Sequence, residues 1–166
     1  SHGCLRGHLA RANPLARELA AAAGGGVAAL ALFHGPQCYI SPGWYASKRE
    51  HGKVVPTWNY VVVEARGRLR GIDDRDWLLA LLDRLTAEHE QAQPLPWHIS
   101  DAPADYIEPM LRAIVGIEIA LDAPLRGKWK TSQNRSAADR DGVAAALRAR
   151  GDDDSLAMAQ LVQPPR

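Results

Sequence analysis

The order of predicted elements indicates an α+β domain that is built on a small antiparallel sheet or barrel. Strand-like segments, rich in β-branched and aromatic residues, come early in the chain, and amphipathic helices are inserted between them or follow them. Of the 166 residues, 46% are hydrophobic, so we expect a packed core and exclude a disordered chain. The strands that the sequence reveals are few for a closed barrel.

Helices are predicted where an N-cap residue precedes apolar residues at helical spacing. Asn13 and Pro14 begin the first, which glycines end. The second is the clearest, because its leucines share one face with Trp77. The run Asp152–Asp154 is expected to cap the last helix rather than bind calcium. The predicted helices span residues 14–23, 74–91, 103–114, 136–150 and 155–162.

Strands are predicted where aliphatic, β-branched or aromatic residues are concentrated. His34-Gly35-Pro36 is typical of a turn, so a hairpin is expected there. Arg66-Gly67 is a second turn signal, after which the chain is expected to return antiparallel. Pro56 cannot donate to a ladder, which requires an edge or a bulge. Residues 41–53 are predicted to form a loop, and the strands span residues 27–33, 37–41, 54–65, 68–72 and 117–121.

Charge and composition exclude several classes of protein. Twenty Lys and Arg residues balance nineteen Asp and Glu residues, which argues against binding nucleic acid by bulk charge. No apolar run approaches the roughly 18 residues of a membrane span. Cys4 and Cys38 form no disulfide framework, so we expect reduced thiols in a cytoplasmic protein. The scattered histidines predict no metal site.

Four polar clusters suggest a ligand-binding site. Each contains hydrogen-bond donors that suit a phosphate, and three also contain aromatic residues that can border a flat ring. One cluster alone is explained equally well by a solvated turn or by the edge of a core. Four clusters in one small domain favour a nucleotide-like ligand, although no phosphate loop, dinucleotide fingerprint or nucleophile elbow is present. The clusters span residues 7–14, 41–48, 55–60 and 128–135.

These clusters lie within motifs that resemble the PaiB-type family of FMN-binding negative transcriptional regulators. This family belongs to the wider group of flavin-reductase-like and pyridoxamine-phosphate-oxidase-like split β-barrels. The matching motifs are GHLARANP (7–14), GPQCYISPGWYASK (35–48), GKVVPTWNYVVVEARGRLR (52–70), SDAPADYIEPMLRAIVGIEI (100–119) and GKWKTSQNR (127–135). Family members usually carry an N-terminal region before the first motif. Because this chain starts almost at that motif, early barrel strands are expected to be missing, by truncation or in a naturally short member.

The resemblance implies a fold, a cofactor and a partner. The fold is α+β, an antiparallel split β-barrel with flanking and C-terminal helices, in which residues 1–135 form the FMN-binding domain and residues 136–166 its helical extension. The partner is a second copy, with FMN at the subunit interface; DNA is possible and a membrane is not expected. Trp58 and Trp129 are either core or dimer-interface residues. The implied cofactor-binding residues are Arg11, Asn13, Ser47, Lys48, Thr57, Asn59, Lys130, Ser132, Gln133 and Arg135.

The expected function is therefore an FMN-binding negative regulator of transcription. The regulatory part rests on the resemblance, because the sequence has no helix-turn-helix signature and little net positive charge. The alternatives are a flavin-dependent oxidoreductase, a haem-degrading split-barrel enzyme, or a remnant of the fold without a cofactor. In an enzyme of this kind the cofactor carries out the redox step, so a catalytic residue need not be visible. None is named here.

Overall fold

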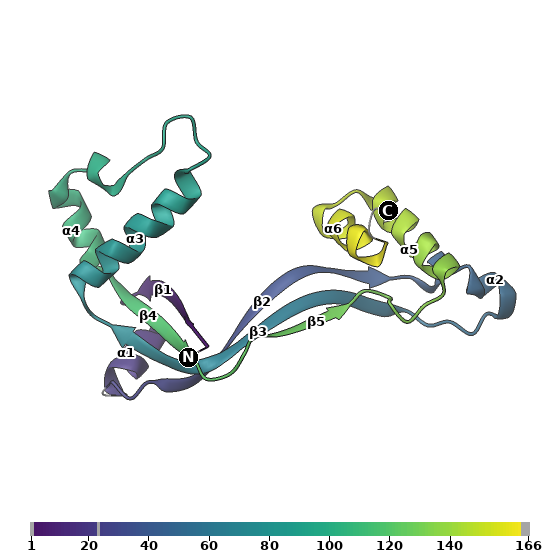
Figure 1. Cartoon of the computed structure of the whole chain (residues 1–166), viewed down its shortest axis with the longest axis horizontal. Helices are drawn as coiled ribbons and strands as arrows, with labels where there is room; N and C mark the ends of the chain where they lie inside the picture. The colour runs from purple at the N-terminus through teal and green to yellow at the C-terminus, as the bar shows by residue number, and fades with distance from the viewer. Residues whose placement is uncertain (1, 23, 164–166) are drawn as a thin grey trace. The chain divides into compact units, whose positions relative to one another are not determined.

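The computed structural model describes residues 2–22 and 24–163 (Figure 1). The chain divides into two compact units. Unit 1 contains Ser1–Leu30 and Ala65–Pro124, and unit 2 contains Ala31–Glu64 and Leu125–Arg166. The long strands β2 (Val27–Ile40) and β3 (Thr57–Ile72) contribute residues to both units.

The sheet of unit 1 is antiparallel and has the order β1-β4-β3, where β1 is Cys4–Ala10 and β4 is Ile114–Leu121. Helix α1 (Pro14–Ala21) places Leu19 beside Gly71 of β3. Helix α3 (Arg75–Glu90) places Trp77 against Gly116 of β4. The short helix η2 (Ile99–Asp101) and helix α4 (Ala104–Arg112) complete the unit.

A buried carboxylate links the three strands of this sheet. Glu118 on β4 is directly opposite both Arg6 on β1 and Arg70 on β3. It accepts hydrogen bonds from Arg6 Nε at 2.8 Å and from Arg70 Nη2 at 2.7 Å. These bonds hold the pKa of Glu118 below its ordinary value, because they favour the charged carboxylate despite its burial.

Unit 2 combines β2, β3 and β5 (Arg126–Lys130), which pairs antiparallel with β3. The short helices η1 (Pro42–Trp44) and α2 (Ser47–His51) follow β2, and the C-terminal helices are α5 (Ala137–Arg150) and α6 (Asp153–Val162). Helices α5 and α6 pack against each other. The core of the unit is formed by Cys38, Ile40, Tyr45, Val143, Ala144, Leu147, Met158, Ala159 and Val162.

The structure confirms the α+β fold class, an antiparallel sheet of split-barrel type with flanking and C-terminal helices. It also confirms the five predicted helices to within a few residues at each end, with Ala23 outside the described residues. The caps at Asn13, Asp74, Ser136 and Asp152 are present as side-chain hydrogen bonds. The domain boundary after residue 135 stays a prediction; in the structure, residues 125–166 group with residues 31–64.

Two glycines that the sequence predicted to be in turns lie inside strands. The predicted hairpin at Gly35 is wrong, because β2 runs through it, and so is the predicted turn at Gly67, because β3 is continuous. Gly116 also lies within a strand, β4. In each case a neighbour occupies the space of a side chain. A Cβ at Gly35 would lie 3.0 Å from Val61 Cβ, one at Gly67 would overlap the Ala120 carbonyl, and one at Gly116 would overlap the Trp77 ring.

Other corrections concern strands and a loop. Strands β1 and β5 were not predicted, but two pairs of predicted strands merge into β2 and β3, so the described residues contain five strands, as many as were predicted. The predicted loop at residues 41–53 contains η1 and α2. The third predicted strand begins at Thr57, directly after Pro56, so the proline needs no bulge.

Candidate functional site

Most of the predicted cofactor-binding residues lie in one unit. Arg11 and Asn13 belong to unit 1. The other eight belong to unit 2, where they come from α2, from the start of β3, and from the end of β5 with the loop after it. These eight are Ser47, Lys48, Thr57, Asn59, Lys130, Ser132, Gln133 and Arg135.

Lys130 and Thr57 are brought together by the pairing of β3 with β5. Lys130 is opposite Tyr60 in the register, and its Nζ donates a hydrogen bond to Thr57 Oγ1 at 2.7 Å. The contact is partly buried, and within the described residues Lys130 has no carboxylate partner. Its positive charge is therefore available to an anionic ligand.

A buried pair fixes the loop that follows β5. Asn59 is fully buried on β3 and donates from Nδ2 to Ser132 Oγ at 3.0 Å, while Ser132 Oγ lies 3.3 Å from Asn59 Oδ1. Ser132 has a φ of 60°, a left-handed conformation that is uncommon for a residue other than glycine. The hydrogen bond between the two side chains offsets the cost of this backbone conformation, because without it both buried polar groups would lack a partner.

Gln133 also shapes this loop rather than pointing freely into solvent. Its Oε1 accepts from the Thr131 amide at 2.8 Å, and its Nε2 donates to the Trp129 carbonyl at 2.8 Å. The side chain thus joins the end of β5 to the start of the loop. We therefore interpret Gln133 as a residue that positions its neighbours.

A cavity of about 370 Å³ adjoins the same loop. Thr131 and Gln133 line one side of it, and Arg140 of α5 lines it as well. Arg140 is partly buried, and within the described residues its guanidinium has no hydrogen-bond or ion-pair partner. Asp141, the acidic residue of the lining, accepts a hydrogen bond from Gln163 Nε2 at 2.8 Å. Thr131 and Arg140 were not among the predicted residues. For Arg140, the sequence offered only the prediction of a helix that follows the last motif.

The remaining predicted residues of unit 2 form a second group. Ser47 donates to the buried Asp139 carboxylate from both its amide and its hydroxyl, each at 2.9 Å. Burial raises the pKa of Asp139, but the hydrogen bonds from Ser47, the charge of Arg135 and the hydrogen bond with Ser136 together leave the pKa below its ordinary value. Arg135 lies over the ring of Tyr45, with Cζ 4.5 Å from the centroid. Lys48 is exposed on α2.

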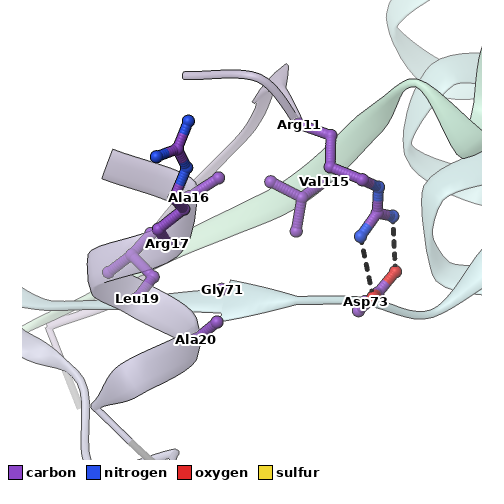
Figure 2. A pocket seen from close by; sticks show the side chains of 8 residues that line it. All are labelled: Arg11, Ala16, Arg17, Leu19, Ala20, Gly71, Asp73 and Val115. Atoms are coloured by element: carbon purple, nitrogen blue, oxygen red, sulfur yellow. Dashed lines mark hydrogen bonds and ion pairs between the residues drawn. The ribbon is translucent and has the colours of Figure 1, made fainter. Parts of the chain in front are cut away.

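Arg11 and Asn13 have structural partners within unit 1. Figure 2 shows Arg11 paired with Asp73 beside a cavity of about 240 Å³. The Arg11 guanidinium donates to Asp73 at 2.8 and 2.6 Å and to two backbone carbonyls. This pairing holds the pKa of Asp73 below its ordinary value. Asn13 Oδ1 accepts from the Leu15 amide at 3.0 Å and so caps α1.

Two tryptophans of unit 2 are exposed. Trp58 is 48% exposed and Trp129 is 50% exposed, so neither is a core residue. Trp58 Nε1 donates to Gln37 Oε1 at 3.2 Å, which fixes its indole against the neighbouring strand β2. Among its described residues, unit 2 therefore combines the cations Lys130 and Arg140, neither of which has a carboxylate partner, with several neutral donors and exposed flat rings. This set of groups fits a ligand that joins a phosphate to a flat ring system, as FMN does.

Among the described residues, no three His, Cys, Asp or Glu side chains are grouped so that they could hold a metal ion. No described helix is both long and apolar enough to cross a membrane.

Comparison with known proteins places this chain in one family and finds curated relatives that match nearly all of it. Residues 1–123 match a family model described as "Putative FMN-binding domain". The chain is 36% identical to an uncharacterized protein of Emericella nidulans, over 98% of this chain and 73% of the relative. It is 30% identical to the protease synthase and sporulation protein PAI 2 of Bacillus subtilis, over 98% of this chain and 73% of the relative.

One solved structure is also similar. The flavocytochrome Anf3 of Azotobacter vinelandii aligns with 78% of this chain at 15% sequence identity and a TM-score of 0.39. The aligned part spans about half of the flavocytochrome chain, 51% of its length.

Proposed function

Because the chain belongs to the family described as "Putative FMN-binding domain", we propose that it is an FMN-binding negative regulator of transcription of the PaiB type. FMN is the cofactor that this family membership assigns to the chain. The regulatory part is supported by the resemblance of the motifs and by the relative from Bacillus subtilis, whose name refers to protease synthesis and sporulation.

The observation that carries the cofactor proposal is that two cations without a carboxylate partner among the described residues, Lys130 and Arg140, adjoin the polar loop after β5. Lys130, with its hydroxyl partner Thr57, and Arg140, at the cavity, would hold the phosphate by charge-assisted hydrogen bonds. The buried Asn59–Ser132 pair would keep the loop in the conformation that presents these donors. When bound, FMN supplies electron transfer at its ring system, and the protein supplies position and charge.

We further propose that the chain acts as a homodimer with FMN at the subunit interface. Two large aromatic side chains of unit 2, Tyr39 and Trp58, are 44% and 48% exposed on one face of β2 and β3, because Trp58 bonds to Gln37, which points to the same side of β2 as Tyr39. A second copy would cover them and would border the flavin from the other side. These two residues are called the exposed apolar surface of unit 2.

Transcription is then repressed in the cytoplasm, either by the FMN-bound dimer itself or through a partner. The net charge of +1 provides little general attraction for DNA, so direct binding would depend on a local basic surface. The two described cysteines are unpaired, which is consistent with a reducing compartment.

The cofactor site is tested by titrating FMN into the protein and into two variants, Lys130→Ala and Arg140→Ala. Each removes one cation, so we expect FMN affinity to fall by about tenfold or more while the circular-dichroism spectrum is retained. Lys53→Ala removes an exposed lysine of the same unit and is the matched control, for which affinity should not change. Unchanged affinity in both test variants would contradict this placement of the phosphate.

The regulatory part is tested with the FMN-bound protein and fragments of genomic DNA from its source organism. A regulator that binds directly should retain a small set of fragments, with an affinity that falls as salt concentration rises. An oxidoreductase should instead oxidise NAD(P)H when FMN is present and retain no specific fragment. The second result would replace the proposed function by the enzymatic alternative.

A further inference from the structure

Unit 1 contains a second cavity, which differs in character from the polar cavity of unit 2. It has a volume of about 350 Å³ and lies among α3, α4, the η2 segment and the adjoining ends of β1 and β4. Its wall is formed mainly by leucine, isoleucine, methionine and tryptophan side chains. The lining residues that matter below are His8, Thr86, Trp97, Ile107, Met110 and Ala113.

Hydrogen bonds between the walls hold this cavity open. Arg75 at the start of α3 donates from Nε to Glu108 of α4 at 3.0 Å, which joins the two helices. Near the other end of α3, Glu90 Oε2 accepts from the Trp97 amide at 3.1 Å, which anchors the segment that carries the indole. The His98 amide donates to Asp101 Oδ2 at 2.9 Å and completes the capping box of η2. These polar bonds fix three walls and leave the space between them unfilled.

The chemistry of the lining defines what fits inside. No Lys, Arg, Asp or Glu side chain is among the lining residues, so a phosphate or carboxylate would lose its water without gaining a charged partner. FMN is therefore excluded from this cavity. The polar side chains of the lining are His8 and Thr86, each of which can form a hydrogen bond with a single hydroxyl, carbonyl or N–H group.

Size gives the second criterion. An apolar cavity of about 150 Å³ holds one benzene molecule. A cavity of about 350 Å³ is more than twice as large and falls within the usual range of ligand pockets. Exposure of the wall supports an open site, because Met110 is 49% exposed although it lines apolar space.

We propose that this cavity is a binding site for a small uncharged molecule with one or two aromatic rings and at most one hydrogen-bonding group. The ligand packs between α3 and α4, its polar group faces His8 or Thr86, and the Trp97 indole borders its ring. The site is separate from the proposed flavin site and gives unit 1 a ligand of its own.

The test uses the full chain with methyl-labelled methionine and indole as the probe. The sequence has two methionines: Met110 lines the cavity, and Met158 is buried in the core of unit 2. Indole in the cavity should shift the Met110 methyl signal saturably through its ring current and leave the Met158 signal in place. No saturable shift of Met110 up to millimolar indole, or equal shifts of both signals, would overturn the proposal.

Two variants fill the cavity, Thr86→Phe on α3 and Ala113→Phe after α4. Each should weaken indole binding, measured by calorimetry, by about tenfold or more because the new ring takes the space of the ligand. Leu156→Phe enlarges an exposed side chain of α6 and should leave binding unchanged. Equal affinity in the filled variants and the control would contradict the site. The methionine measurement uses the unaltered protein, so it can still refute the proposal even if a cavity-filling variant does not fold.

Discussion

Tyr45 and Asp139 are both buried polar residues of unit 2, yet they differ in how their polar atoms are satisfied. The Asp139 carboxylate accepts two hydrogen bonds from Ser47, and its backbone amide donates to Ser136 Oγ at 3.1 Å. The Tyr45 hydroxyl is buried and has no hydrogen-bond partner within the described residues. An unsatisfied buried hydroxyl lowers stability, because it loses its bonds to water on folding.

We therefore predict that Tyr45→Phe raises the free energy of unfolding by about 1 kcal/mol, since it removes the hydroxyl and keeps the ring beneath Arg135. Urea denaturation followed by circular dichroism measures the change. Tyr39→Phe is the matched control, because the Tyr39 side chain is exposed rather than buried. A clear loss of stability in Tyr45→Phe would show that the hydroxyl has a partner in solution.

Single residues also show how far the sequence could predict the site. The motifs identified the polar residues around β5, and the structure brings Lys130 to Thr57 and Asn59 to Ser132. That Arg140 joins this group depends on how α5 packs, which no local pattern encodes. The motifs also could not show that Arg11 is already bound by Asp73, a residue far away in the sequence.

At the level of elements, the helices were predictable and several strand features were not. Helix caps are local signals, and those at Asn13, Asp74 and Ser136 are present. Glycine has two uses that look alike in a sequence: it permits turns, and it permits close approach of a neighbouring segment. Gly67 has the second use, because its neighbour on β4 leaves no room for a Cβ.

We predict that Gly67→Ala lowers the free energy of unfolding by about 1–3 kcal/mol, since the added methyl would overlap the Ala120 carbonyl and lie 2.9 Å from Ile119 Cγ2. Gly7→Ala is the control within the same sheet, because a Cβ there lies 3.7 Å from Ile117, an ordinary contact. Chemical denaturation of both variants makes the comparison. Equal stability of the two variants would favour the turn interpretation of Gly67.

The sequence did not reveal strands β1 and β5, and the reason differs between the two. In β1, Leu5 and Leu9 alternate with polar residues, and this signal was hidden by the interpretation of residues 7–14 as a ligand-binding cluster. In β5, the sequence RGKWK contains no aliphatic residue and so carries no strand pattern. Its pairing with β3 is a tertiary property.

At the level of the whole molecule, the proposed dimer depends on the exposed apolar surface of unit 2. We predict that Trp58→Arg converts a dimer into a monomer, because it places a charge within the surface that a second copy would cover. Sedimentation equilibrium measures the mass directly. Leu156→Arg changes an exposed leucine of α6 outside this surface and should leave the mass unchanged. A dimer that survives Trp58→Arg would exclude this surface as the interface.

The central claim is that this chain binds FMN, and a visible absorption spectrum tests it most directly. The protein is incubated with excess FMN, passed through gel filtration, and the spectrum of the protein peak is recorded. We expect flavin bands that elute with the protein at close to one FMN per chain, and that are weaker after the same treatment of Lys130→Ala. A folded, colourless protein peak would contradict the claim and would favour a remnant of the fold without a cofactor.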